Sequence, residues 1–218
     1  MARKMRRWVI IGGAEIRDYK LMRKYLRHDD YYVYCDCGLR HQEKLGAVPD
    51  LIIGDFDSHE RPEDLSNVIV LPVEKDDTDT IYAVKEGMER GYDDFLMIGA
   101  TGGRHDMTLG NIYALLMLAK SGKNALMVDD CSEMKIITPG QVQKVRYGWR
   151  CFSLLNIAGT ARGITITGAK YCLDDAEIVP EYQYGISNEV LSPDDDAVIT
   201  LREGALLLVC VADSKHCR

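Results

Sequence analysis

The pattern of apolar and polar residues changes once along the chain. Up to about residue 130, short apolar runs such as "WVII", "YYVY", "LII", "VIVL" and "FLMI" alternate with longer segments whose apolar residues recur at three- and four-residue spacing. The short runs predict buried strands and the longer segments predict amphipathic helices. Strands that alternate with helices favour a mostly parallel sheet flanked by helices, so an α/β domain is predicted here.

The two clearest helix signals follow the apolar runs "VIVL" and "FLMI". In "DTDTIYAVKEGMERG", Asp77 or Thr78 can cap the start and Gly91 is placed at the end. The second segment, "MTLGNIYALLMLAKSG", predicts a long apolar helix.

After about residue 131 the pattern becomes one of short β-rich runs. Segments such as "MKIITPG", "RCFSLLNI", "GITITGAKY" and "ALLLVCV" are mostly separated by Gly, Pro, Asn or Asp, and none has a convincing helical period. This pattern predicts an all-β domain, a small sandwich or barrel. We therefore expect two domains, 1–133 and 134–218.

Charge and hydropathy narrow the class of protein. The chain has 27 basic and 34 acidic residues, a formal charge of −7, which argues against nucleic acid as a partner. A phosphate-binding protein of this charge would need a cation as a bridge. The longest apolar run, "ALLLVCVA", is far shorter than the roughly 20 residues of a membrane span, and the N-terminal run is too short for a secretory signal. We expect a cytoplasmic protein that does not contact membranes.

Acidic residues follow two of the predicted strands. Asp36 follows "YYVY", and Asp55 and Asp57 follow "LII". Residues two apart in an extended segment point the same way, roughly 6.6 Å apart, and like charges at that spacing favour a divalent cation between them. Oxygen ligands select Mg²⁺, Mn²⁺ or Ca²⁺ over zinc. An isolated D-x-D is more often a surface turn.

Two further motifs follow the next strands. "EKDDTDT" places acidic residues around a helix start, beside Lys75, which suits a phosphate oxygen, although one of the acids is explained by ordinary capping. "GATGGRHD" combines glycines, Arg104 and the start of a helix, a pattern that suits an anion but also a plain turn. Because the carboxyl ends of parallel strands meet at one edge, the motifs together predict a metal–polyphosphate site and phosphoryl transfer.

The order of the motifs resembles the thiamine pyrophosphokinase family, in its bacterial type. The likeness runs through "GDFDS", "KDDTD", "GATGGRHDMTLGNI", "GAKYCL" and "GISNE", and so covers both predicted domains. It implies an α/β domain followed by a β-sandwich. It also implies transfer of the pyrophosphoryl group of ATP to the hydroxyl of thiamine, with Mg²⁺ as cofactor and AMP as the second product. The family works as a homodimer, with active sites between subunits.

The resemblance also assigns roles to residues. It implies that Mg²⁺ is held by Asp36, Asp55, Asp57 and Asp79, and that the catalytic residues are Asp55, Asp57, Asp79 and Asp106. For the nucleotide it implies Asp36, Lys75, Thr78, Gly102, Gly103, Arg104 and Asn111. For thiamine it implies Tyr171, Ser187 and Asn188. A flat aromatic such as Tyr171, which sequence alone reads rather as a core residue, suits the cationic thiazolium or the aminopyrimidine.

The chain departs from the family pattern in three places. Met107 stands where the family usually has His, Cys172 where it often has Pro, and "CDCGLRH" keeps only Asp36 and Gly38 of its counterpart. The acidic set is complete, so we expect an active enzyme. Three alternatives stay open: a pyrophosphokinase for another small alcohol such as a pterin, a glycosyl- or nucleotidyltransferase that uses "DFD" with a metal, and a non-catalytic thiamine or nucleotide sensor.

Overall fold

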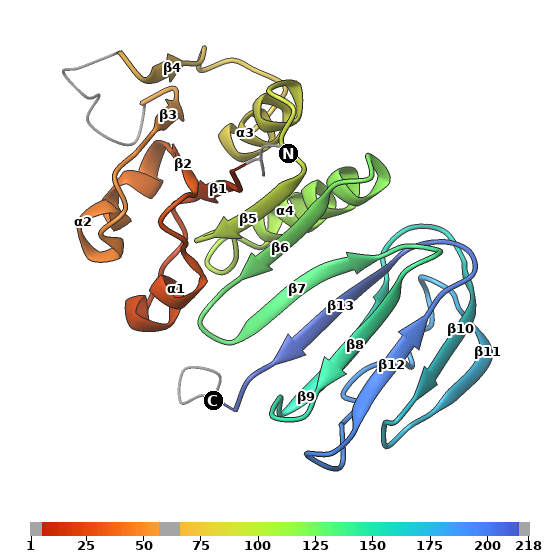
Figure 1. Ribbon diagram of the computed structural model, residues 1–218. Coiled ribbons are helices and arrows are strands. Elements are labelled where there is room, and N and C mark those ends of the chain that lie inside the picture. Colours follow the sequence, from red (N-terminus) through yellow and green to blue (C-terminus); the bar gives the residue numbers. More distant parts are fainter. Residues whose placement is uncertain (1–5, 57–65, 214–218) are drawn as a thin grey trace, which may run out of the picture. The chain divides into compact units, whose positions relative to one another are not determined.

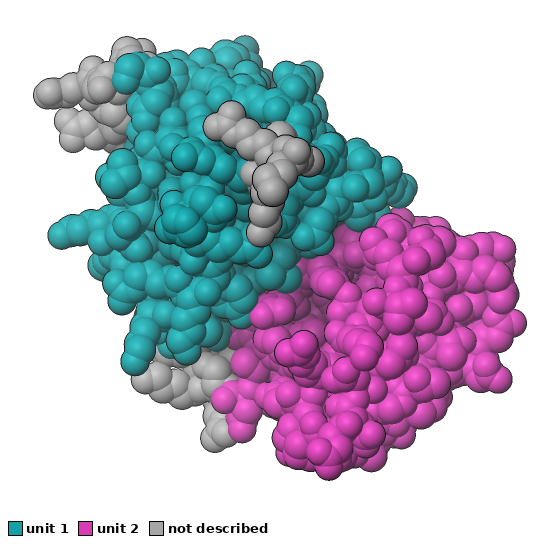
Figure 2. Space-filling model, viewed as in Figure 1, with its two compact units in different colours: residues 1–130 teal, residues 131–218 magenta. Residues whose placement is uncertain are grey.

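A computed structural model describes residues 6–56 and 66–213 of the chain (Figure 1). The chain divides into two compact units, residues 1–130 and 131–218 (Figure 2). Each unit has its own sheet structure and its own buried cluster of apolar side chains, and each is described in turn.

The first unit is built on a parallel sheet. Its strands lie in the order β4-β3-β2-β1-β5-β6, and every neighbouring pair is parallel. Four strands, β1 to β3 and β5, are almost wholly buried, as expected where both faces of a parallel sheet are covered. The strands are β1 (Trp8–Ile11), β2 (Tyr31–Cys35), β3 (Leu51–Gly54), β4 (Val68–Val70), β5 (Asp94–Ile98) and β6 (Asn124–Val128).

Helices cover both faces of this sheet, because successive residues of a strand point to opposite sides. From β1, Val9 packs in one cluster with Met22 of α1, while the indole of Trp8 donates a hydrogen bond of 3.0 Å to the Ala83 carbonyl of α3. The helices of this unit are α1 (Tyr19–Tyr25), the 3₁₀ helix η1 (Asp36–His41), α2 (Gln42–Leu45), α3 (Asp79–Glu89) and α4 (His105–Lys120).

The second unit contains two antiparallel sheets. One has the order β7-β13-β9 and the other β11-β10-β12-β8. A single buried cluster takes side chains from both, among them Phe152 of β9 and Ile164 of β10, so the unit is a sandwich. The strands are β7 (Ser132–Ile137), β8 (Val142–Arg146), β9 (Cys151–Asn156), β10 (Ala161–Thr167), β11 (Leu173–Ile178), β12 (Asp196–Thr200) and β13 (Leu206–Val211).

The predicted fold class, a mostly parallel α/β part followed by a β-sandwich, is confirmed. Among the residues that the structure describes, no helix has the length and apolar character needed to cross a membrane.

The loops that follow β1 and β5 approach each other closely. Gly12 donates a backbone hydrogen bond of 2.8 Å to the Ile98 carbonyl, and Ala14 donates one of 2.9 Å to Gly99. A Cβ on Gly12 would lie 2.5 Å from the Gly99 oxygen, and Gly99 itself has a φ of 63°. Only glycine fits at both positions. The close approach fixes the loops at the carboxyl edge of the sheet, where the candidate site lies.

Gly38 of η1 is a second point of close packing, because a Cβ there would lie 2.1 Å from the Ile11 carbonyl oxygen of β1. Gly38→Ala should therefore push η1 away from the sheet and lower the free energy of unfolding by about 2–3 kcal/mol. Chemical denaturation measures this. Gly110→Ala in α4 is the matched control, because nothing lies within 4 Å of its Cβ position, and it should leave stability unchanged or raise it. Equal effects of the two changes would contradict the packing argument.

Candidate active site

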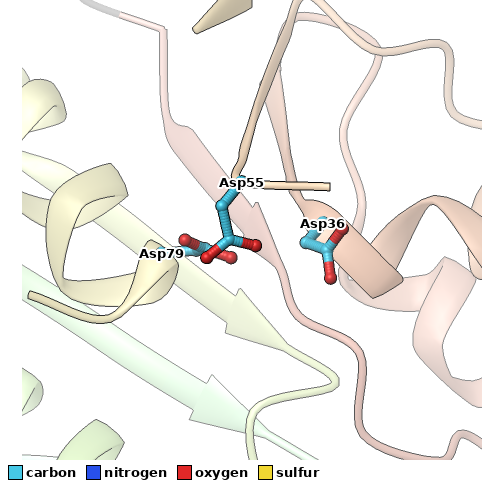
Figure 3. Close-up of side chains that lie close together, drawn as sticks. All are labelled: Asp36, Asp55 and Asp79. Carbon is cyan, nitrogen blue, oxygen red and sulfur yellow. The ribbon is translucent and has the colours of Figure 1, made fainter. Parts of the chain in front are cut away.

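Three carboxylates converge at the carboxyl edge of the parallel sheet (Figure 3). Asp36 begins η1 directly after β2, Asp55 follows β3, and Asp79 begins α3. Each offers one oxygen, and these oxygens all lie within 4.8 Å of one another. Asp36, Asp55 and Asp79, which come from three separate segments, thus form one group. This group is called the acidic cluster below.

The position of Asp36 depends on local backbone geometry. Asp36 has a φ of 35°, which is uncommon for a residue with a side chain. Gly54, at the end of β3, lies so close that a Cβ there would be 3.0 Å from the Asp36 Cβ. Backbone strain of this kind concentrates at functional sites. Gly54 thus makes room for a strained Asp36, which directly follows the neighbouring strand β2.

The acidic cluster is partly shielded from water, and burial and neighbouring charges raise the pKa of one member, Asp79. Asp36 is 8% exposed, and its Oδ1 is buried without a hydrogen-bond partner, while its Oδ2 accepts a bond of 3.1 Å from the Cys37 thiol. Burial raises the pKa of Asp79, and the charges of Asp55 and Asp36 add to this, against the opposing effect of Lys75. A buried oxygen without a partner is costly unless a ligand binds it.

Lys75 supplies part of the missing positive charge. Its ammonium donates a hydrogen bond to Asp55 and lies 3.0 Å from Asp79 Oδ1, an ion-pair distance at which the hydrogen-bond geometry is poor. Burial lowers the pKa of Lys75, but the two carboxylates outweigh burial and raise it. Three carboxylates and one ammonium leave a formal charge of −2, which one divalent cation would balance. Oxygen donors of this kind fit Mg²⁺.

Two other residues were predicted for this edge of the sheet. Asp57 lies outside the described residues. Thr78 caps α3, because its hydroxyl accepts a bond of 3.3 Å from the Ile81 backbone N–H. This is the ordinary capping role that the sequence allowed for one residue of the motif.

Among the described residues, the side-chain hydrogen bonds of the glycine loop after β5 do not reach the acidic cluster. Gly102 and Gly103 have φ values of 92° and 66°, and no atom lies within 4 Å of either Cβ position. The exposed Arg104 donates two hydrogen bonds to the exposed Asp106, of 3.2 and 2.6 Å, and this contact lowers the pKa of Asp106. The loop therefore presents open backbone and a bidentate guanidinium, both of which suit a phosphate.

Two polar side chains of α4 form hydrogen bonds with the loop. The Gly102 backbone N–H donates a bond of 3.0 Å to the Thr108 hydroxyl. The buried Asn111 donates a bond of 2.7 Å to the Ala100 carbonyl. Asn111 thus fixes the position of the loop through this hydrogen bond.

The residues predicted to bind thiamine lie in the second unit. Tyr171, between β10 and β11, is 60% exposed, whereas Asn188 is 4% exposed. Ser187 is exposed and has a φ of 60°, and its backbone N–H donates a bond of 3.0 Å to the Ser153 hydroxyl. The buried Ser153 thus holds Ser187 in a strained conformation.

Sequence reasoning missed three residues that shape these sites. Gly54 could have been found, since a glycine at the end of an apolar strand often marks a close backbone approach. The thiol of Cys37 and the hydroxyl of Ser153 gave no signal, because each acts through a contact that only the folded chain creates.

Comparison with known families gives two matches. Residues 22–127 match the family described as "Thiamin pyrophosphokinase, catalytic domain", and residues 141–206 match "Thiamin pyrophosphokinase, vitamin B1 binding domain". A curated protein, the thiamine pyrophosphokinase of Bacillus subtilis (strain 168), is 28% identical over 176 residues, which cover 77% of this chain and 81% of that protein. The whole acidic cluster lies within the stretch that matches the catalytic domain.

Solved structures are similar over nearly the whole chain. The crystal structure of thiamine pyrophosphokinase from Bacillus subtilis has a TM-score of 0.84 and 24% identity, and covers 96% of this chain and 100% of that one. That of thiamin pyrophosphokinase from Geobacillus thermodenitrificans has a TM-score of 0.80 and 28% identity, with 96% and 99% covered.

Magnesium should stabilise the protein in a pH-dependent way. Because the pKa of Asp79 is raised above its ordinary value of 3.8, the folded metal-free protein holds more protons than the unfolded chain just above pH 3.8. The contribution of Asp79 to the stability of the metal-free protein therefore falls as the pH rises through that window. A bound divalent cation should offset this loss and raise the melting temperature by roughly 5 °C at pH 7.5. Near pH 3 it should have no effect.

Thermal unfolding in EDTA and in Mg²⁺, across this pH range, measures the effect. Asp79→Asn should remove most of the response to Mg²⁺. Asp93→Asn is the control, because Asp93 is exposed and pairs with Lys123, and it should keep the response. A stabilisation by Mg²⁺ that survives in Asp79→Asn would place the ion elsewhere.

Proposed function

The chain belongs to the thiamine pyrophosphokinase family, and we propose that its acidic cluster holds Mg²⁺ for the reaction of that family. The reaction transfers the pyrophosphoryl group of ATP to the hydroxyl of thiamine and gives thiamine diphosphate and AMP. The comparisons give no support to the alternative acceptor, a pterin.

The proposal depends on one observation, the acidic cluster and its net negative charge. Asp36, Asp55 and Asp79 would be the protein ligands of the ion, and the buried, unpaired Asp36 Oδ1 is the atom that most needs one. Asp57, outside the described residues, remains a proposed fourth ligand from its spacing to Asp55. When bound, Mg²⁺ would neutralise phosphate charge and help to hold the triphosphate in line.

We propose that the glycine loop binds phosphate oxygens of ATP. The open backbone of Gly102 and Gly103 lets an anion approach, and the Arg104 fork can bind two oxygens at once. Asp106, proposed from sequence as catalytic, orients that fork through its two hydrogen bonds. Asn111 and Thr78 would contribute by fixing the loop and the start of α3. Lys75 offers a further cation to the phosphates.

For thiamine, the proposal rests on the exposed ring of Tyr171 and the strained Ser187, both within the stretch that matches the vitamin B1 binding domain. A positively charged thiazolium is attracted to the face of an aromatic ring. The Ser187 hydroxyl is exposed and suits a polar group of the ligand. In this scheme the thiamine hydroxyl attacks the β-phosphorus and AMP leaves.

We also propose a homodimer in which each active site combines the first unit of one subunit with the second unit of its partner. The support is the resemblance together with the division of labour between units, since the acidic cluster lies in the first and the candidate thiamine residues lie in the second. We place the reaction in the cytoplasm, where ATP is made.

Product analysis tests the activity. Wild-type protein with Mg²⁺, ATP and thiamine should form AMP and thiamine diphosphate in equal amounts, and EDTA should stop the reaction. Asp55→Asn should lower kcat by about 10²–10³, because it removes a charged ligand of the ion that would neutralise the reacting phosphates. Asp93→Asn should stay near wild type. ADP in place of AMP would contradict a pyrophosphokinase, and ligand binding without any product would identify a sensor.

Mixing two impaired variants tests the shared site, at a thiamine concentration so far below the KM of Tyr171→Ala that each variant alone is nearly inactive. Asp55→Asn is defective in the first unit and Tyr171→Ala in the second. If each site takes one unit from each subunit, unfolding and refolding an equal mixture should restore about a quarter of wild-type activity, because half of the dimers are mixed and each has one intact site. Sites built within one subunit would stay inactive in every dimer, and a monomer by light scattering would also contradict the proposal.

A further inference from the structure

The three candidate thiamine residues of the second unit are not equivalent. The Tyr171 ring and the Ser187 side chain are exposed, but Asn188 is 4% exposed. A ligand on the surface can reach the first two residues, whereas Asn188 lies beneath them. The polar atoms of Asn188 must therefore be examined for what they already contact.

The amide of Asn188 binds both backbone polar groups of Tyr171. Its Oδ1 accepts a hydrogen bond of 3.0 Å from the Tyr171 N–H, and its Nδ2 donates one of 2.7 Å to the Tyr171 carbonyl. The same Oδ1 accepts a bond of 2.9 Å from the Glu189 N–H. One side chain thus holds the backbone of one residue at two points.

Asn188 is itself fixed to the sandwich. Its backbone exchanges two hydrogen bonds of 2.8 Å with Phe152 of β9, a fully buried residue. The residues next to Tyr171 and Asn188 are also paired. The Lys170 backbone N–H donates a bond of 2.9 Å to the Glu189 carbonyl, and the two side chains form an ion pair at 3.0 Å. A continuous series of contacts therefore runs from the core of the unit to Tyr171.

The two-point contact matters because Tyr171 is an exposed loop residue. It lies outside the strands, is 60% exposed, and has the Lys170 ammonium 5.6 Å from its ring centre. An exposed loop residue that must be ordered on binding loses conformational entropy at that moment. A backbone that is already fixed reduces this loss.

We infer that Asn188 is a positioning residue, which acts on thiamine by holding Tyr171 rather than by touching the ligand. This inference rests on the proposed function, in which the Tyr171 ring contacts thiamine. The burial of Asn188 and the two-point contact carry it. A ligand that took the place of Tyr171 on the Asn188 amide would leave the backbone N–H and carbonyl of Tyr171 without these partners.

The test is a double-mutant cycle between Asn188→Asp and Tyr171→Ala. Asn188→Asp keeps the shape but puts an acceptor against the Tyr171 carbonyl, so it should raise the KM for thiamine about tenfold. The kcat and the KM for ATP should change less than about twofold. In the Tyr171→Ala background the same change should alter the KM for thiamine by less than about twofold, because no ring remains to be positioned. Calorimetric titration with thiamine checks that KM follows affinity.

The matched control is Asn156→Asp. Asn156 is also buried in the second unit, donates to the Ile178 carbonyl and accepts a bond of 3.1 Å from the Ala158 N–H, and its side-chain hydrogen bonds in the described part of the chain do not involve Tyr171. It should lower the melting temperature without changing the KM for thiamine. If Asn188→Asp does not fold, Asn188→Ser takes its place, since the shorter hydroxyl cannot reach both backbone groups.

Two results would overturn the inference. The first is an equal effect of Asn188→Asp with and without the Tyr171 ring, which would mean that Asn188 contacts thiamine independently. The second is an unchanged KM for thiamine in Tyr171→Ala. Both leave the proposed reaction standing, although the second would remove Tyr171 from the proposed thiamine contacts. A wild-type protein that makes no thiamine diphosphate would refute the reaction itself.

Discussion

The arrangement of the first unit depends on one electrostatic constraint, the crowding of three carboxylates at the carboxyl edge of a parallel sheet. Parallel strands bring Asp36 and Asp55 to the same edge, and the start of α3 adds Asp79. Like charges at these distances repel, and the raised pKa of Asp79 reflects both burial and that repulsion. Only opposite charge makes such a cluster stable, and Lys75 supplies one unit of it.

Much of this site could be predicted from sequence, because it depends on the spacing of apolar residues and on the order of strands and helices along the chain. Apolar runs that alternate with helical segments predict the parallel sheet, and the sheet predicts that residues after successive strands meet. Asp36, Asp55 and Asp79 follow from that reasoning, and the structure brings them together. The short β-rich runs of the second unit likewise predict a sandwich or barrel, and the structure forms a sandwich.

What could not be predicted depends on contacts across the fold. The sequence gives Tyr171, Ser187 and Asn188 as one group, but nothing in it shows that Asn188 is buried and bound to the backbone of Tyr171. Similarly, the spacing in "GGRHD" does not show that Arg104 and Asp106 bind each other in the open. A motif identifies which residues gather, whereas burial and hydrogen bonding determine how each of them acts.

The position of Lys75 affects the charge balance of the acidic cluster between reactions. A cluster of carboxylates with no internal counter-charge must keep its ion at all times or rearrange. Here an ammonium on the same chain pairs with two of the three carboxylates, so the charge of the cluster is partly balanced without any bound ion. Such a pocket is suited to an ion that arrives and leaves as a complex with each nucleotide rather than one that is permanently resident.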